Sequence, residues 1–289
     1  MLCACLATFV AGAHAQETGT LQKIRDAKAA AIGVRDAAAP LSYATGSGSY
    51  TGYHVELCRK VLEELAPGVQ ITYVAVTSTN RIPLVRNGTI QMECGSTTNT
   101  DARQKDVAFS VTTFVAEIRM AVRKSSGLQS LEQLGGKTVV TTAGGTGVTL
   151  LRKQARALNA DFNVLMGRDH AESFLMLESG RADAFVLDDN VLAGLIALSA
   201  KPQEFAIVGE PMSADPNAIM LPRDDSDFKA AVDAILKRMM RNGEMAALYD
   251  KWFMQPIPPR GVTVGLPMSA SLKRSFQEPN DRSSEKFVK

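Results

Sequence analysis

The fold class is clearest in residues 55–94, which read VELCRKVLEELAPGVQITYVAVTSTNRIPLVRNGTIQMEC. Apolar residues recur at positions 57, 58, 61, 62 and 65, a spacing that predicts a helix with one buried face. Gln70–Val76 then alternates apolar and polar side chains, as a half-buried strand does. A second helix is expected from Asn80, which can cap it, to Asn87, followed by a strand over Ile90–Cys94. This alternation predicts a mostly parallel sheet covered by helices.

The same alternation continues on both sides of this stretch. A strand is expected over Ile32–Arg35, and a separate series of elements begins near residue 138. The elements expected there and beyond are strand Thr138–Thr142, helix Val148–Leu158, strand Ala182–Leu187, helix Asn190–Leu198 and an amphipathic helix from Phe228 to Met239. Two α/β units in one chain predict two lobes with a cleft between them. The extended apolar segments Phe114–Val122 and Ile207–Met212 lie between the two patterns and are the expected hinges.

The N-terminal residues predict export. Leu6–Gly12 is short and apolar, and Ala13-His14-Ala15 follows as a cleavage motif, so residues 1–15 read as a signal peptide. An ordinary buried N-terminal segment is the alternative, and Cys5 is a weaker lipoprotein signal. Lys plus Arg number 32 against 30 Asp plus Glu, a balance that does not favour nucleic-acid binding.

Two of the four cysteines would remain after cleavage. The signal peptide would carry away Cys3 and Cys5, leaving Cys58 and Cys94 in an oxidising compartment. Export therefore favours a Cys58–Cys94 disulfide, with two buried thiols as the alternative. Their spacing, together with only 3 histidines, offers no metal site, and no cofactor is expected.

Polar residues gather where the expected strands end. These positions are Arg35, Ser78–Arg81, Ser96–Arg103, Thr142–Thr146 and Asp188. Each alone could be a solvated loop. In open α/β sheets, however, ligands sit at the carboxyl ends of strands and near helix N-termini, so the set together predicts a binding site.

The chemistry of these residues suits a ligand with two carboxylates and one amine. Arg35, Arg81 and Arg103 can each grip a carboxylate with two parallel hydrogen bonds. Asp188 could hold an ammonium group, although Asp189 beside it is an equal candidate on chemistry alone. Hydroxyl donors are available at Ser78, Ser96, Thr98, Thr142 and Thr146. A helix starting after Gly144-Gly145 would add free N–H groups, but no Lys-Ser or Lys-Thr follows, which disfavours a nucleotide loop.

Longer motifs resemble a known family, the periplasmic glutamate/aspartate-binding proteins of ABC amino-acid importers, within solute-binding protein family 3. The motifs that carry the resemblance are residues 78–84 (STNRIPL), 93–99 (ECGSTTN), Asp169-His170, 177–181 (LESGR), Asp188-Asp189, Lys251-Trp252-Phe253 and 256–259 (PIPP). The resemblance runs from about Gln22 to Asn280, and the cysteine-containing motif is its most specific part.

The resemblance implies a type II periplasmic-binding-protein fold, two α/β lobes that close on a ligand. Lobe 1 would comprise residues 16–116 and 212–266, lobe 2 residues 117–211, and residues 267–289 a loosely packed tail. It further implies a periplasmic monomer that captures L-glutamate or L-aspartate and delivers it to an ABC transporter permease in the membrane.

The resemblance also implies a role for each polar residue. Arg103 would pair with the α-carboxylate, helped by Ser96, Thr98 and Thr142, and Asp188 would hold the α-ammonium. The side-chain carboxylate would be held by Arg35, Ser78, Arg81 and His170. On chemistry alone His170 reads as a surface residue. This chain also departs from the family, because Gly145 stands where a second hydroxyl is often found, with Thr146 next to it.

Other functions on the same scaffold are less well supported. A cyclohexadienyl dehydratase-like enzyme needs a free acid or base in the cleft, and Asp188 is the main acid there. A binding protein for a neutral amino acid would leave Arg35 and Arg81 buried without a counter-charge, which is costly. A sensor module would need a transmembrane or catalytic segment. The sequence does not rank glutamate against aspartate, which differ by one methylene.

Overall fold

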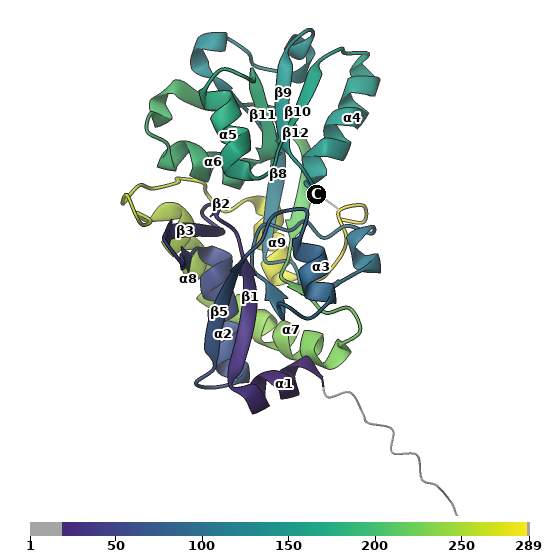
Figure 1. The fold of residues 1–289 in the computed structure, drawn as a ribbon, viewed down its shortest axis with the longest axis vertical. Helices are drawn as coiled ribbons and strands as arrows, with labels where there is room; N and C mark the ends of the chain where they lie inside the picture. Colours follow the sequence, from purple (N-terminus) through teal and green to yellow (C-terminus); the bar gives the residue numbers. More distant parts are fainter. Residues whose placement is uncertain (1–18, 288–289) are drawn as a thin grey trace, which may run out of the picture.

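Two α/β units lie end to end along the long axis of the molecule (Figure 1). The computed structural model describes residues 19–287, so the predicted signal peptide lies outside the described residues. Each unit holds one five-stranded sheet with helices on both faces (Figure 1). The α/β class expected from the sequence is therefore confirmed.

The lower unit in Figure 1 contains a sheet of strand order β5-β1-β6-β13-β7. Its strands are β1 (Ala29–Val34), β5 (Gln70–Ala75), β6 (Met92–Glu93), β7 (Ala108–Phe109) and β13 (Met220–Leu221). β1 pairs in parallel with β5 and β6, whereas β13 runs antiparallel to β6 and β7. A small antiparallel sheet beside it contains β2 (Ala37–Ala38), β3 (Ser42–Gly46) and β4 (Ser49–Thr51).

Helices cover this sheet on both faces. They are α1 (Thr20–Ala27), α2 (Tyr53–Leu65), α3 (Arg81–Arg86), α7 (Ser226–Arg241), α8 (Glu244–Tyr249) and α9 (Ala270–Gln277). The stripes predicted for α2 and α7 are confirmed, since Leu62 and Phe228 meet in one core. α3 begins after Asn80 as expected. The Asn80 side chain, however, accepts a hydrogen bond from Thr77 N–H rather than capping the helix.

The upper unit contains a sheet of strand order β10-β9-β11-β8-β12. Its strands are β8 (Phe114–Arg123), β9 (Thr138–Thr142), β10 (Asn163–Gly167), β11 (Ala184–Asp188) and β12 (Phe205–Asn217). α4 (Thr146–Leu158), α5 (His170–Glu178) and α6 (Asp189–Leu198) flank it. Neighbouring residues of β11 enter different cores, Phe185 in one and Val186 in the other, as expected of a strand buried on both faces.

The expectation of mostly parallel sheets is wrong for several strands. β8 runs antiparallel to both β11 and β12, and β13 to its two neighbours. The reason lies in the path of the chain, which passes from the lower to the upper unit along β8 and returns along β12. Phe114 packs in the lower core and Met120 in an upper one, so β8 joins the two units. An apolar run reveals burial, not the direction of the neighbouring strand.

The expectation of a loosely packed C-terminal tail is also wrong. α9 buries Leu272 and Phe276 in the lower core. These two residues are four apart and share one face of the helix, which allows an otherwise polar segment to dock. Beyond α9, Asn280 O accepts from Thr112 N–H, and Ser284 N–H donates to Asn99 O. The C-terminal segment is therefore bonded both to the loop that follows β6 and to the residues between β7 and β8.

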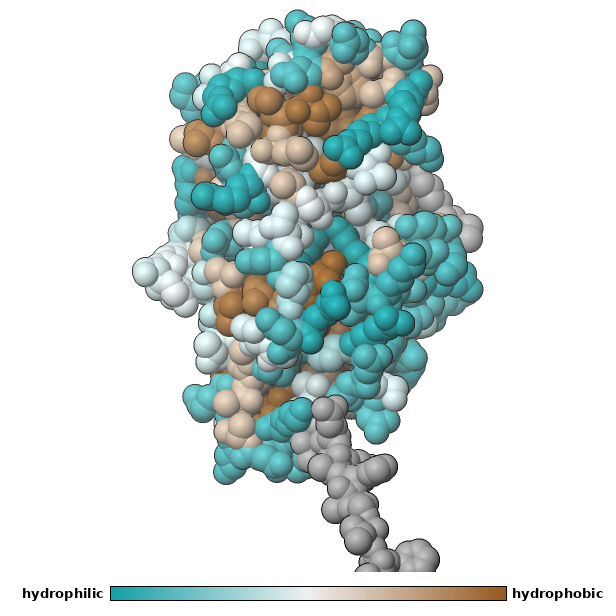
Figure 2. Space-filling model, turned by 45° about the vertical axis from the view of Figure 1, so that its right-hand side comes forward, coloured by the Kyte–Doolittle hydropathy of each residue, from teal (hydrophilic) through white to brown (hydrophobic). Residues whose placement is uncertain are grey.

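The outer surface is mostly hydrophilic on the face drawn in Figure 2, with apolar patches on both units. Among residues 19–287, no helix is both long enough and apolar enough to cross a membrane.

Candidate ligand-binding site

The predicted site residues lie where the two units face each other. From the lower unit, Arg35 follows β1, Ser78 precedes α3, and Ser96 follows β6. From the upper unit, Thr142 ends β9 and Asp188 ends β11. Each position is at or near the carboxyl end of a strand, where backbone groups are left free for a ligand. Less than a tenth of the surface is exposed for Arg35, Ser78, Arg81, Ser96, Thr98, Thr142, His170 and Asp188.

Arg35 and His170 connect the two units. Arg35 Nη2 donates to Ser78 Oγ at 3.1 Å and lies 3.1 Å from His170 Nε2. Because a guanidinium only donates, Nε2 accepts, and the ring proton is on Nδ1, 2.9 Å from Thr142 Oγ1. Burial and the charge of Arg35 lower the pKa of His170 well below its usual value, so the imidazole is neutral. The surface interpretation of His170 is wrong, because the side chain is only 3% exposed.

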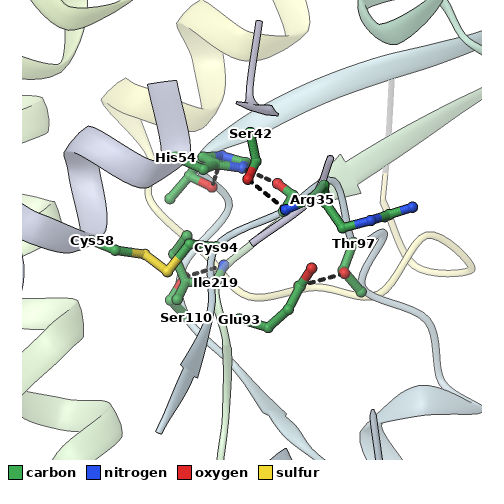
Figure 3. The surroundings of a disulfide bond; sticks show 11 residues. Arg35, Ser42, His54, Cys58, Glu93, Cys94, Thr97, Ser110 and Ile219 are labelled. Atoms are coloured by element: carbon green, nitrogen blue, oxygen red, sulfur yellow. Dashed lines mark hydrogen bonds between the residues drawn. A yellow bond between two sulfur atoms is a disulfide. The ribbon is translucent and has the colours of Figure 1, made fainter. Parts of the chain in front are cut away.

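Arg81 is accompanied by a buried carboxylate that the sequence interpretation did not use. Arg81 Nη1 lies 3.9 Å from Glu93 Oε1 and donates to Ser96 O at 3.5 Å. Glu93 Oε2 accepts from Thr97 Oγ1 at 2.6 Å (Figure 3). Burial and the neighbouring Arg81 lower the pKa of Arg35 to about 10, while the charge of Glu93 opposes this shift. An acid in the short strand expected over Ile90–Cys94 was the available signal for Glu93.

Arg103 lies closer to the edge of the site and is half-buried. Its Nη1 donates to Thr98 O at 2.7 Å, and its Nη2 donates across to Gly144 O in the upper unit at 3.1 Å. Thr98 Oγ1 donates to Asp215 Oδ2 at 3.2 Å. Asp215 was also missed, because it lies in β12 just beyond the expected hinge Ile207–Met212, where the sequence gives no local sign of a polar role.

The structure distinguishes Asp188 from Asp189. Burial raises the pKa of Asp188 to about 7, with Asp215 and Asp189 adding to the rise, while Arg81 and Arg103 oppose it. Asp189 instead accepts a hydrogen bond from Glu117 N at 3.0 Å, which ties α6 to β8. Asp188 is thus the carboxylate coupled to the arginines.

The loop between β9 and α4 brings the units into close approach. Gly144 has a φ of 76°, and a Cβ there would lie 2.8 Å from Ser78 O. Thr146 is half-buried at the start of α4 and borders a pocket of about 790 Å³ that Arg103 and Asp215 also line. Of the ten predicted residues, Thr146 and Arg103 therefore stand at the rim and the other eight inside.

A predicted disulfide braces the lower half of the site. Cys58 of α2 and Cys94, directly after β6, are bonded, which confirms the pairing (Figure 3). His54, also on α2, binds Gly95 O through Nδ1 and Thr113 Oγ1 through Nε2. Burial lowers the pKa of His54 to about 4, so it remains neutral at neutral pH. The contact with Gly95 O, together with the disulfide at Cys94, fixes the backbone just before Ser96.

No group of three or more His, Cys, Asp or Glu side chains in the described part of the chain could hold a metal ion. The polar atoms of the site are instead cationic and neutral donors, with Asp188 as an acceptor. That combination suits an organic ligand carrying both negative and positive groups.

Comparison with known proteins places the chain in a family. Residues 30–255 match the family model described as bacterial extracellular solute-binding proteins, family 3. The L-glutamate/L-aspartate-binding protein of Pseudomonas aeruginosa is 43% identical over 93% of this chain and 91% of its own length. The glutamate/aspartate import solute-binding protein of Escherichia coli is 38% identical over 91% and 89%.

Solved structures support the same conclusion. A mutant arginine-binding protein from T. maritima superposes with a TM-score of 0.73 at 26% identity, covering 81% of this chain and 99% of that one. An ancestral amino-acid-binding protein, a precursor of cyclohexadienyl dehydratase, gives 0.70 at 27% identity over 81% and 99%. These structures share the two-lobed binding fold expected from the sequence. The chain belongs to the bacterial extracellular solute-binding proteins of family 3.

Proposed function

We propose that the protein captures L-glutamate or L-aspartate between its two lobes in the periplasm and delivers it to the permease of an ABC importer. One observation carries the proposal: three arginines of the lower unit converge with a buried aspartate of the upper unit. The ligand would supply two carboxylates and one ammonium to that set. The names of the Pseudomonas aeruginosa and Escherichia coli relatives support the same ligand class.

The residues divide between the two ends of the ligand. Arg103 binds the α-carboxylate because its guanidinium lies at the rim with neutral hydroxyls beside it, and Asp188 binds the α-ammonium. The remaining members of the α-carboxylate group are Ser96, Thr98 and Thr142, with Thr146 and the N-terminus of α4 nearby. Arg35, Ser78, Arg81 and His170 bind the side-chain carboxylate.

His170 changes tautomer in this proposal. In the structure Nε2 accepts from Arg35, which leaves the proton on Nδ1. A carboxylate beside Nε2 needs a donor there, so the proton must reside on Nε2. Thr142 accommodates either state, because a hydroxyl can accept from Nδ1–H or donate to bare Nδ1. The Thr142 hydroxyl also lies 3.0 Å from Ser173 Oγ, which continues the hydrogen-bonded chain.

The lobes that close are residues 16–116 with the chain from residue 212 onward, which includes α9 because it packs in the lower core, and residues 117–211. Core membership supports these limits, since Ala116 packs in the lower core and Ile118 in an upper one. The β8–β12 pairing is irregular between Val208 and Ser213, which gives a place for bending. Small-angle scattering should show a smaller radius of gyration with glutamate, and an unchanged radius at saturation would contradict closure.

We propose no catalytic function. The relatives named above are solute-binding proteins. Asp188, with a pKa of about 7, is the group a dehydratase would use as an acid, and the ligand ammonium occupies it here. Incubation with a cyclohexadienyl substrate should yield no product above the rate in buffer.

A thermal-shift screen of ligand-stripped protein against the common amino acids tests the ligand class. A ligand that binds only the folded state adds ~2.7 kcal/mol of stability at a hundredfold excess over its dissociation constant. Glutamate and aspartate should raise the melting temperature most. An equal shift with glutamine would overturn the acidic-ligand proposal.

A further inference from the structure

Glu93 lies behind the arginines without facing the expected ligand. Its side chain is fully buried, and Oε2 is held by Thr97. Oε1 lies 3.9 Å from Arg81 Nη1. Among residues 19–287, neither Oε1 nor Arg81 Nε has a hydrogen-bond partner. An ion pair with unused donor and acceptor atoms is a costly arrangement in a protein interior, so stability alone explains it poorly.

The surrounding backbone is built to bring Glu93 close to the arginines. A Cβ on Gly95 would lie 2.1 Å from Glu93 Oε1 and 2.8 Å from Arg35 Cγ, so only glycine leaves room. The disulfide at Cys94 holds the strand end between these residues (Figure 3). The position of the carboxylate is therefore fixed by a covalent bond on one side and by Thr97 on the other.

The charges at this end of the site can be counted. Arg35 and Arg81 contribute two positive charges, and Glu93 contributes one negative charge. Asp188 also acts on both arginines, but the ligand ammonium offsets its charge, and Asp169 has the smallest effect on Arg35. The sum is one positive charge, which matches the single negative charge of a glutamate or aspartate side chain. Without Glu93, the same pocket would carry two positive charges against one.

We infer that Glu93 determines specificity by limiting this end of the pocket to one net positive charge, so that a singly charged side chain is preferred over neutral and doubly charged ones. The inference rests on the proposed function. Glu93 acts through the potential that the two arginines present and touches no ligand atom. Arg81 keeps its orientation because Ser96 O and Glu93 both lie on its Nη1.

Four proteins and three ligands test this charge count. The proteins are the wild type, Arg81→Gln, Glu93→Gln and the double variant; the ligands are glutamate, glutamine and the phosphonate analogue of glutamate at pH 8. Calorimetry gives each affinity ratio. In Glu93→Gln, preference for glutamate over glutamine and for phosphonate over glutamate should each rise about ten-fold or more, since a unit charge has been removed nearby.

The double variant gives the sharpest result. Arg81→Gln leaves one positive and one negative charge, so preference for glutamate over glutamine should nearly vanish. Adding Glu93→Gln returns the net charge to one positive and should restore about ten-fold or more of that preference. If Glu93 had only a structural role, the double variant would prefer glutamate over glutamine no more strongly than Arg81→Gln does. That result would overturn the inference.

Folding and ligand class are controlled separately. Glu93→Asp keeps the negative charge and should retain the wild-type affinity ratios. A change in these ratios as large as that in Glu93→Gln would contradict the role of the Glu93 charge. If Glu93→Gln does not fold, the double variant still decides, because it removes both members of the buried pair. If the wild type binds glutamine as tightly as glutamate, the proposed function itself is wrong. If the wild type prefers glutamate but the Glu93 variants leave the affinity ratios unchanged, only the inference about Glu93 is wrong.

Discussion

The two halves of the site differ in charge and in how they are held. The lower unit supplies Arg35, Arg81 and Arg103, and braces their loops with the Cys58–Cys94 bond. The upper unit supplies neutral His170 and Thr142 with acidic Asp188, positioned by the ends of strands and the starts of helices. Like charges crowded in one half repel each other, so that half needs covalent and ionic bracing. The other half needs only to complete the site on closure.

The largest expected effect is on the rim arginine of the lower half. Arg103→Ala should weaken glutamate and aspartate alike, by about 2–5 kcal/mol, because a buried α-carboxylate is left unpaired. Calorimetry measures it, with Arg238→Ala as control. Arg238 is an exposed arginine of α7 in the same unit that pairs with Glu64 and Glu244 away from the site, so its loss should leave affinity unchanged. Selective loss of one of the two ligands would contradict a shared α-carboxylate role.

Removal of the disulfide tests the bracing. The bond closes a loop with a sequence separation of 36, so replacing Cys58 and Cys94 with Ala should cost about 4 kcal/mol of unfolding free energy. Urea unfolding of the variant against the oxidised wild type gives the difference. We expect the lower unit to lose protection from hydrogen exchange first. Earlier loss of exchange protection in the upper unit would contradict the view that the lower unit depends more on bracing.

Closure itself can be blocked at Gly144. In Gly144→Ala the new Cβ would meet Ser78 only when the lobes are closed, so glutamate affinity should fall about ten-fold or more, while the open protein gains only backbone strain at the positive φ. Gly48→Ala is a matched control, since Gly48 also has a positive φ of 72° but nothing lies within 4 Å. Equal affinity losses in both variants would mean that backbone strain, and not contact between the lobes, limits binding.

The smallest effect concerns pH and the acid of the upper half. Because burial raises the pKa of Asp188 to about 7, the carboxyl holds its proton below that pH in the ligand-free structure. An ammonium needs the carboxylate, so binding releases a proton, and affinity should weaken by up to about ten-fold per pH unit below 7. Calorimetry between pH 8 and 6 checks this, with Asp188→Asn losing the pH dependence. A wild-type affinity that is constant over this range would count against Asp188 as the ammonium ligand.

The sequence by itself determined the α/β class, most helices, and the disulfide pair. Periodicity was sufficient for α2 and α7, because burial of one helix face leaves a repeating apolar pattern. It was also sufficient to locate polar loops at strand ends, where Arg35 and Thr142 lie. The predicted cleavage of the signal peptide would leave only two cysteines, and pairing was then favoured over two buried thiols.

Only the tertiary structure decided how charges are shared across the site. The direction of β8 depends on the path of the chain between units, which an apolar run does not encode. Contacts between residues far apart in sequence bury His170 and place Glu93 beside Arg81. They also give Asp188 and Asp189 different partners. Electrostatic environment is a property of the assembled interior, because desolvation and neighbouring charges exist only once the chain has packed.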